Sequence, residues 1–272
     1  MALTDDQLER YSRHIILKDV GIEGQEKILQ GKVLIIGAGG LGAPAALYLA
    51  AAGVGTIGLV DGDVVDLSNL QRQVIHFTPD IDKPKVISAK EKIEQINPEA
   101  KVIAYQERVF ANNISDIISR YDFIIDGTDN FPAKFLINDA CVMAKKPFSH
   151  GGILRFDGQT ITYVPGHTCY RCIFIKPPPR NAVPSCSQAG VLGAVAGMLG
   201  TIQAAEALKF LIGKGKLLTD RLLIFNAFTM DFRTVHCDRN SACPVCGNNP
   251  SISKLEDYEQ PVCDLHEKRD GV

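Results

Sequence analysis

Short apolar runs alternate with longer segments of helical periodicity through the first half of the chain. Each run has the length of a strand buried on both faces, and each longer segment can place an apolar stripe against a sheet. This alternation predicts an α/β fold, a Rossmann-like doubly wound sheet with a parallel first half. The expected strands cover 32–36, 54–60, 101–105, 123–125 and 147–150, and the expected helices cover 41–52, 85–97, 114–118 and 132–144.

The pattern changes after residue 152, where short strands follow one another without an intervening helix. We expect strands over 153–156 and 160–164 joined by a turn at Asp157-Gly158. Two more strands are expected near 222–225 and 232–235. The parallel half of the sheet therefore continues into antiparallel strands.

A helical arm is expected before the first strand. Thr4 and Gln7 have the spacing of a capping box, in which each side chain binds the backbone amide of the other residue. A short helix should follow Thr4. A polar segment over 21–31 then leads into the sheet.

Residues 189–212 form the one segment that resembles a membrane span in length and apolar content. Gln203, Glu206 and Lys209 recur every third residue, so the helix carries a polar stripe. We therefore expect a helix that is buried or faces a second subunit, and no membrane association.

The apolar strand 32–36 runs directly into a turn rich in glycine. Glycines let the backbone turn tightly and approach a ligand, and the following helix points its positive N-terminus at an anion. Asp61 ends the next strand about 20 residues later, where such units place a ribose acceptor. Glycine turns are also plain connectors, but this combination favours nucleotide binding. The glycines are Gly37, Gly39, Gly40 and Gly42.

Composition and charge narrow the classes of function. The chain has 272 residues, 46% of them hydrophobic, enough to bury the core of one large domain. The formal net charge is −2, which gives no support for a nucleic acid or an anionic membrane as partner. Residues 1–7 are acidic and polar, unlike a signal peptide, so we expect a cytoplasmic protein. In that reducing compartment the eight cysteines should serve metal ligation or thiol chemistry rather than disulfides.

Four cysteines form two C-x-x-C pairs, Cys169 with Cys172 and Cys243 with Cys246. Two such pairs supply the ligands of one tetrahedral Zn²⁺ site, and a closed site of four thiolates leaves no position for a substrate. We therefore predict a structural zinc knuckle. A redox pair or a chance arrangement would explain one pair, but neither explains both well.

Cys186 stands outside that set, in a predicted loop just before a helix, where the helix dipole favours a thiolate. The residue alone is equally compatible with a nucleophile and with a structural cysteine.

Positive and negative side chains follow the expected strands near the glycine turn. Arg13, Arg72 and Lys85 are the cations nearest this site in sequence, and Asp129 is the carboxylate best placed for Mg²⁺. Each of them taken singly is more typical of a solvated surface charge. Together with a phosphate-binding turn they favour cleavage of a triphosphate, since that reaction needs cations and a metal ion to disperse charge.

Several of these motifs occur together in one known family. The chain resembles the MoeB/ThiF/HesA family, the bacterial relatives of ubiquitin-activating enzymes, over roughly residues 8–250. It also resembles the adenylyltransferase half of eukaryotic fusion proteins, without their sulfurtransferase domain. We expect one adenylating domain over 1–250, including the helical arm, and a C-terminal tail over 251–272. The resemblance rests on Arg10 to Arg13, the glycine turn, Ser68 to Gln73, Lys83 to Lys85, Thr128 to Asn130, the cysteine pairs and Cys186 to Val191.

The resemblance implies a reaction and a set of residue roles. The family adenylates the C-terminal glycine carboxylate of a small ubiquitin-like sulfur-carrier protein with ATP, which releases pyrophosphate. It works as a homodimer in which the residue corresponding to Arg13 enters the site of the second subunit. A cysteine at the position of Cys186 can bond the activated carrier, and a sulfurtransferase or a cysteine desulfurase is then a further partner. ATP and Mg²⁺ would be held by Gly40, Asp61, Ser68, Asn69, Arg72, Lys85, Asp129 and Asn130.

Other functions are compatible with parts of the same sequence. A glycine turn followed by Asp61 also occurs in NAD-dependent oxidoreductases, but the cations after Ser68 have no evident use there. A scaffold that only binds nucleotide and carrier is a second alternative, and a family member that activates a carboxylate on a tRNA base is a third. The zinc knuckle and Cys186 favour the sulfur-carrier branch. Thiamine, molybdopterin, cysteine and thionucleoside synthesis are all compatible with the sequence.

Overall fold

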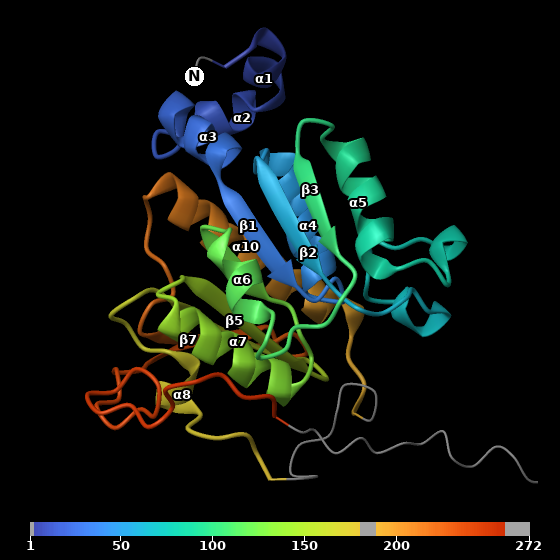
Figure 1. The fold of residues 1–272 in the computed structure, drawn as a ribbon. Helices are drawn as coiled ribbons and strands as arrows, with labels where there is room; N and C mark the ends of the chain where they lie inside the picture. The colour runs from blue at the N-terminus through green and yellow to red at the C-terminus, as the bar shows by residue number, and fades with distance from the viewer. Residues whose placement is uncertain (1–2, 180–188, 259–272) are drawn as a thin grey trace, which may run out of the picture.

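One mixed sheet organises residues 3–179 and 189–258, the part of the chain that the computed structural model describes (Figure 1). Its strands lie in the order β3-β2-β1-β4-β5-β6-β7-β8. The neighbours in the part β3-β2-β1-β4-β5 pair in parallel, and the neighbours in the part β5-β6-β7-β8 pair antiparallel. The expected fold class is therefore confirmed. The bounds are β1 (Lys32–Ile36), β2 (Thr56–Val60), β3 (Lys101–Tyr105), β4 (Phe123–Asp126), β5 (Phe148–Leu154), β6 (Asp157–Tyr163), β7 (Arg221–Asn226) and β8 (Asp231–His236).

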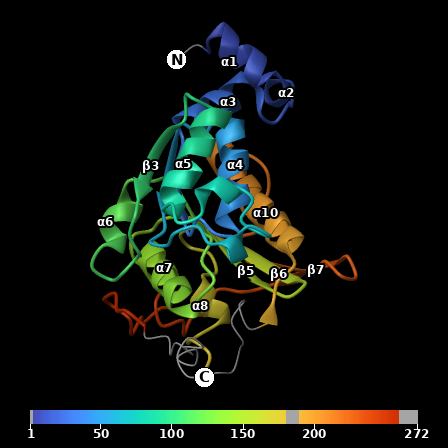
Figure 2. The ribbon, with the colours of Figure 1, turned by 90° about the vertical axis from the view of Figure 1, so that its right-hand side faces the viewer.

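Helices cover both faces of the parallel half (Figures 1 and 2). Helices α3, α4, α5 and α10 pack on one face, and α6 and α7 pack on the other. The buried residues of these strands are mostly apolar because alternate residues, such as Val33 and Leu34, enter the two different cores. The bounds are α1 (Asp5–Arg10), α2 (Ser12–Ile15), α3 (Gly21–Gln30), α4 (Gly42–Ala52), α5 (Lys85–Ile96), α6 (Ile114–Ser119), α7 (Phe131–Met143), α8 (Tyr170–Ile173) and α10 (Gly193–Ile212), with 3-10 turns at Leu67–Asn69 and Thr78–Asp80.

The arm begins with the expected capping box: Thr4 Oγ1 accepts the Gln7 amide, and Gln7 Oε1 accepts the Thr4 amide. The polar segment over 21–31, for which the sequence predicted no element, forms helix α3. Its Gln25 is buried, donates to the Ala52 carbonyl and hydrogen-bonds His14. A polar residue on the inner face hides the helical pattern in the sequence.

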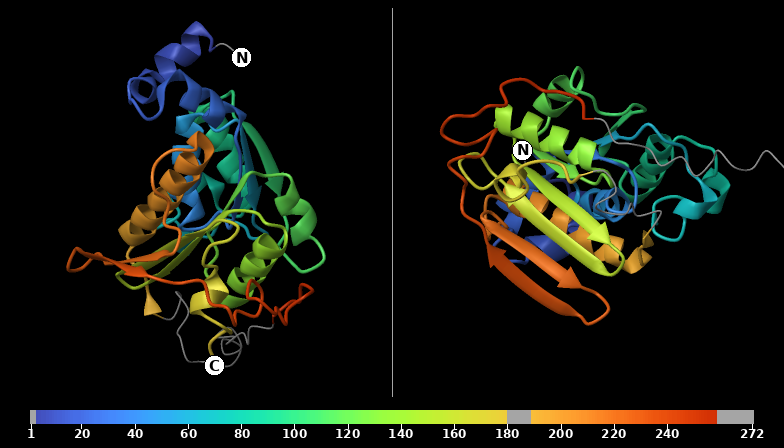
Figure 3. Two further views of the ribbon diagram at one scale, coloured as in Figure 1. Left: turned by 90° about the vertical axis from the view of Figure 1, so that its left-hand side faces the viewer. Right: turned by 90° about the horizontal axis from the view of Figure 1, so that it is seen from below.

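The hairpin turn lies earlier than Asp157-Gly158, so that prediction is wrong. Strand β5 is continuous from Phe148 to Leu154, the turn falls at Arg155 with a φ of 55°, and Asp157 begins β6. Gly158 lies inside the strand because Phe225 packs over it, and a Cβ there would be 2.3 Å from the Phe225 ring. Figure 3 shows the antiparallel strands side by side in the view from below.

Helix α10 alone, among the described residues, is long and apolar enough to cross a membrane, and half of its apolar window is buried in the protein. It packs against α4, β5 and β6. Its polar stripe faces the protein: Gln203 and Glu206 are buried and hydrogen-bonded to the sheet or to the segment that follows the helix. The buried half agrees with the first of the two alternatives that the sequence left open, a buried helix.

Residues 251–258 pack onto the domain, although the sequence placed them in a tail. Asp257 Oδ1 accepts the Ala111 amide over 2.8 Å, and the Tyr258 hydroxyl lies 2.6 Å from an Arg171 nitrogen. Leu255 contacts the same core as α6 and α7. The ordered contacts of the domain thus extend past residue 250.

Candidate functional site

The glycine turn, residues 37–42, follows β1 at the carboxyl edge of the parallel strands. Gly37 has a φ of +97°, which L side chains rarely adopt, and a Cβ there would lie 2.8 Å from the Gly127 carbonyl oxygen. A Cβ on Gly42 would lie 1.9 Å from the Gly37 carbonyl oxygen. Only glycine fits these two positions, so the turn is pressed tightly against the end of β4.

Two predicted site residues contact this turn. The Arg72 stem lies over Gly40, 3.6 Å from where a Cβ would stand, and its Nη1 donates to the Ser68 carbonyl over 2.9 Å. The Asp61 carboxylate accepts the Ala38 amide over 2.9 Å. Burial raises the pKa of Asp61, because it outweighs the attraction of Lys85 and the amide hydrogen bonds. Asp61 thus braces the turn from the end of the neighbouring strand β2.

The loop after β2 is ordered by its own side chains. Asp66 caps the 3-10 turn at Leu67–Asn69 by accepting the Ser68 amide over 2.7 Å, and Asn69 Oδ1 accepts the Asp66 amide. The Ser68 hydroxyl and the Ser68 amide both donate to the Asp66 carboxylate and lower its pKa. Ser68, Asn69 and Arg72 are therefore presented together from one short, capped segment.

Lys85 lies in the first turn of α5, as predicted, and its side chain is only 8% exposed. Its Nζ is 3.3 Å from Asp63, and Asp63 also pairs with Arg108 over 2.9 Å. Burial opposes ionisation of Asp63, but the hydrogen bonds from Arg108 and Lys85 outweigh it and lower its pKa. The sequence did not single out this carboxylate, which holds a cation beside Asp61.

Asp129 and Asn130 lie in the segment after β4, next to the glycine turn. Asn130 is the N-cap of α7 and accepts the Ala133 amide over 2.9 Å, whereas Asp129 is exposed. The Thr128 amide nitrogen would be 3.2 Å from a Cβ on Gly37. The structure therefore brings this segment together with Arg72, Lys85 and Asp61 around the glycine turn.

Two buried side chains that the sequence did not assign to the site also contact the turn. His76 Nε2 is 3.0 Å from the Ala38 carbonyl oxygen, and its Nδ1 is 2.9 Å from Ser88 Oγ. Gln73 lies against Gly39, and its Oε1 is buried without a hydrogen-bond partner among the described residues. The spacing of His76 to the other histidines shows no metal-ligand pattern, so no motif in the sequence singles it out.

Arg13 is exposed on α2, near the end of the sheet where the parallel strands begin, whereas the glycine turn lies where β1 ends (Figure 1). The neighbouring Tyr11 packs on Gly53 at the C-terminal end of α4, and its hydroxyl accepts a hydrogen bond from Asn97 at the C-terminal end of α5. The glycine turn lies at the N-terminal end of α4. The chain therefore keeps its own Arg13 about one helix length, roughly 16 Å, from its own turn.

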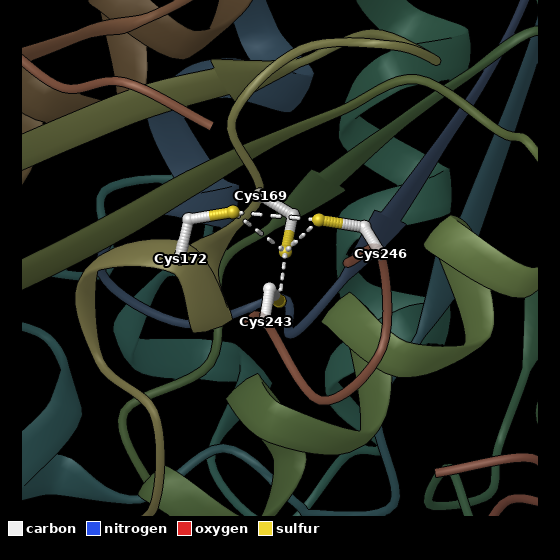
Figure 4. A group of neighbouring side chains, drawn as sticks. All are labelled: Cys169, Cys172, Cys243 and Cys246. Carbon is white, nitrogen blue, oxygen red and sulfur yellow. Dashed lines mark hydrogen bonds between the residues drawn. The ribbon is translucent and has the colours of Figure 1, made fainter. Parts of the chain in front are cut away.

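The four knuckle cysteines converge, with their sulfur atoms pointing toward one another (Figure 4). Cys169 Sγ is 3.8 Å from Cys172, 3.6 Å from Cys243 and 3.5 Å from Cys246. Four ligands about 2.3 Å from a tetrahedral Zn²⁺ would lie about 3.8 Å apart, so donor type and spacing fit zinc. Cys186 lies in 180–188, outside the described residues.

Together these features define a class of Rossmann-like α/β protein. In this class a glycine turn of the kind that binds anions follows the carboxyl end of the first strand, and four cysteines form a knuckle. Residues 11–245 match the model of the ThiF family, and the chain belongs to this family. The resemblance found in the sequence is thereby confirmed.

Relatives in three organisms show how far the likeness extends. A sulfur carrier protein adenylyltransferase of Thermus thermophilus is 45% identical over 95% of this chain and 98% of its own length. A SAMP-activating enzyme E1 of Haloferax volcanii is 45% identical over 95% of this chain and 96% of its own length. The probable adenylyltransferase/sulfurtransferase MoeZ of Mycobacterium tuberculosis is 45% identical, and this chain covers 66% of it.

Solved structures show the same fold. The crystal structure of Escherichia coli MccB with ATP superimposes with a TM-score of 0.76 at 25% identity, over 88% of this chain and 75% of that one. The fold and the family thus agree.

Proposed function

We propose that the chain is an adenylyltransferase that uses ATP to activate the C-terminal carboxylate of a small ubiquitin-like sulfur-carrier protein. The observation that carries the proposal is the gathering of Arg72, Lys85 and the segment after β4 around the glycine turn. The names of full-length relatives support the enzyme class and the carrier as substrate. They favour this reading over an NAD oxidoreductase or a tRNA-modifying enzyme.

In this proposal the substrate ATP lies along the glycine turn. The backbone at Gly40 accommodates the nucleotide at the N-terminal end of α4, where the helix dipole favours phosphate. Asp61 offers its carboxylate to the ribose, and Ser68 and Asn69 flank the same side. Arg72 and Lys85 supply positive charge to the phosphates, and Asp63 keeps the Lys85 ammonium in place.

Asp129 and Asn130 offer oxygen donors, the ligand type that Mg²⁺ prefers. Asp129 is free to serve because it is exposed beside the turn. When bound there, Mg²⁺ would neutralise charge that develops on the phosphates.

The chemistry needs positioning more than proton transfer. The carrier's terminal carboxylate is already an anion at pH 7, so no side chain has to act as a base. One of its oxygens bonds to the α-phosphorus while the bond from that phosphorus to the β-phosphate oxygen breaks, and pyrophosphate leaves. The protein's residues hold the two reactants in line and disperse the negative charge of the transition state.

The partners follow from the same proposal. We infer a homodimer, because Arg13 cannot serve its own site from the far edge of the sheet. Sulfur would come from a sulfurtransferase or a cysteine desulfurase. The relative MoeZ is named for adenylyltransferase and sulfurtransferase activities together, which supports the first of these. Cys186 is the candidate for a bond to the activated carrier. A zinc knuckle of thiolates suits a reducing cytoplasm.

The test of the function is ATP–pyrophosphate exchange with a panel of carrier proteins that end in glycine. We expect exchange with at least one carrier and none without a carrier. NAD-linked oxidation of small alcohols serves as the control reaction and should be absent. Absence of exchange with every carrier, in protein that still binds ATP, would instead favour a non-catalytic scaffold.

Mixing two inactive variants tests the role of Arg13. Arg13→Ala and Asp129→Ala should each be inactive, and random mixing of their subunits should restore about a quarter of the wild-type sites, because each mixed dimer contains one intact site. The measurement is exchange activity after subunit mixing. If Arg13 acted within its own chain, no mixed site would be intact, and activity would stay at the level of the separate variants.

A further inference from the structure

A buried polar cluster lies directly beneath the segment that carries Asp129. Its centre is Asp126, the last residue of β4, which is fully buried. One carboxylate oxygen accepts both the amide and the hydroxyl of Thr128, over 3.0 and 2.6 Å. The other oxygen is 3.2 Å from Lys134 Nζ and 2.9 Å from His150 Nδ1. The Asp126 carboxylate therefore joins this segment to α7 and β5.

The cluster fixes the course of the chain after β4. The Gly127 amide donates to the Ile36 carbonyl over 2.8 Å, and Asp126 holds both polar groups of Thr128. Burial alone would raise the pKa of Asp126, but Lys134 and the hydrogen bond from His150 outweigh it and bring the pKa to about 2. The carboxylate is thus ionised, and charge-assisted hydrogen bonds of this kind are stronger than neutral ones.

His150 enters this cluster from β5 and is 1% exposed. Its ring lies 4.2 Å from the ring of Tyr170, and burial together with the nearby Lys134 lowers its pKa, so the imidazole is neutral at pH 7. The single proton belongs on Nδ1, because that nitrogen faces a carboxylate. Nε2 is buried and has no hydrogen-bond partner among residues 3–179 and 189–258.

Packing alone does not explain why a histidine occupies position 150, because its buried Nε2 has no partner among the described residues. A buried polar atom without a partner destabilises a fold, and an apolar side chain in contact with Tyr170 would avoid that cost. What the imidazole adds is the Nδ1–H bond that orients the Asp126 carboxylate toward Thr128. The buried ring is therefore explained by its effect on the segment that ends in Asp129 and Asn130.

We propose that His150 is a positioning residue that acts through Asp126 and Thr128 to hold Asp129 where it can bind the metal ion of a metal–nucleotide complex. The inference rests on the proposed function for the identity of that complex. His150 itself touches neither nucleotide nor metal.

A matched pair of substitutions separates positioning from packing. An asparagine amide can take the place of imidazole Nδ1, so His150→Asn keeps a donor for Asp126, whereas His150→Leu fills the space without one. The probe is Mn²⁺ in the presence of ATP. Its binding is measured from the electron paramagnetic resonance signal of free Mn²⁺. Exchange activity with the carrier is measured in parallel, and thermal unfolding reports the stability of each variant.

We expect His150→Leu to raise the Mn²⁺ concentration for half-saturation by about tenfold or more, the scale on which metal sites respond to loss of outer supporting contacts. His150→Asn should restore most of that affinity. The KM for the carrier should stay unchanged in both variants. Thr128→Val removes the hydroxyl donor on the opposite side of Asp126, without altering the contact with Tyr170, and should reproduce the loss of metal affinity.

The outcomes distinguish this proposal from the proposed function. Unchanged Mn²⁺ affinity in both His150→Leu and Thr128→Val would overturn the positioning role, even if exchange activity is normal. Equal losses in His150→Leu and His150→Asn would overturn it as well, since packing would then explain both. Suppose that no carrier supports pyrophosphate exchange by the wild type, while the variants still weaken Mn²⁺ binding in the presence of ATP. The positioning role then stands, and the proposed reaction fails.

Discussion

Asp129→Ala is expected to lower ATP–pyrophosphate exchange by about 100- to 1,000-fold, the range seen when one group that stabilises a charged transition state is removed. The carboxylate is exposed and follows a segment held by Asp126 and Thr128, so its loss removes a metal ligand without opening the core. Unfolding temperature should stay within the small range typical of surface substitutions. Exchange activity and thermal unfolding are the measurements.

The matched control is Asp116→Ala, which removes an exposed aspartate on α6. Its carboxylate pairs only locally with Arg120, and such a surface pair contributes little to stability. Exchange should be unchanged in this variant. Should Asp129→Ala retain wild-type exchange over a range of Mg²⁺ concentrations, Asp129 would not be a metal ligand.

The parallel half of the fold could be predicted from the sequence because most of its strands contain a continuous apolar run, as β1 does. Val33 and Leu34 enter opposite cores, so both must be apolar, and the run stands out from its surroundings. The glycine turn was predictable for a related reason. Gly37 and Gly42 occupy positions that exclude a Cβ, and such positions restrict the residue type strongly.

The contacts made by buried polar side chains were not predictable in the same way. Gln25 in α3 and Gln203 in α10 are buried, and each satisfies carbonyl groups of distant segments. Gln203 also occupies the space beside Gly151, so the glycine pair in β5 marks a close helix contact rather than the break in the strand that the sequence suggested. These contacts depend on tertiary structure, which local periodicity does not contain.

The candidate site divides along the same line. Residues that follow strand ends, such as Asp61 and Asp129, could be placed near the glycine turn because parallel strands bring their carboxyl ends to one edge. The side chains that hold other residues of the site in place could not be predicted from the sequence. Asp63 lies in the loop after β2 and reaches Lys85 on helix α5. His150 lies on β5 and reaches Asp126 on β4, and helix α7 separates these two strands in the sequence.

Cys172→Ser is expected to lower both zinc content and stability. Serine is a poor ligand for zinc, and the free energy of binding a structural metal is part of the free energy of folding. The knuckle is linked to α7 through α8, because the Tyr170 amide binds Asn138 and the Arg171 guanidinium binds Asp139. Loss of the metal should therefore loosen a helix that packs on the sheet.

The magnitude and the control follow from the same contacts. A loss of about 3 kcal/mol would lower the Tm of a domain of this size by roughly 10 °C. Zinc per chain is measured by metal analysis, and Tm by calorimetry. Cys237→Ser is the control, because Cys237 is outside the four ligands although its carbonyl accepts the hydroxyl of Thr168, the residue before Cys169. This variant should keep its zinc. One zinc per chain and an unchanged Tm in Cys172→Ser would mean that the four cysteines do not form a structural metal site, since each ligand of a closed tetrahedral site contributes to holding the metal.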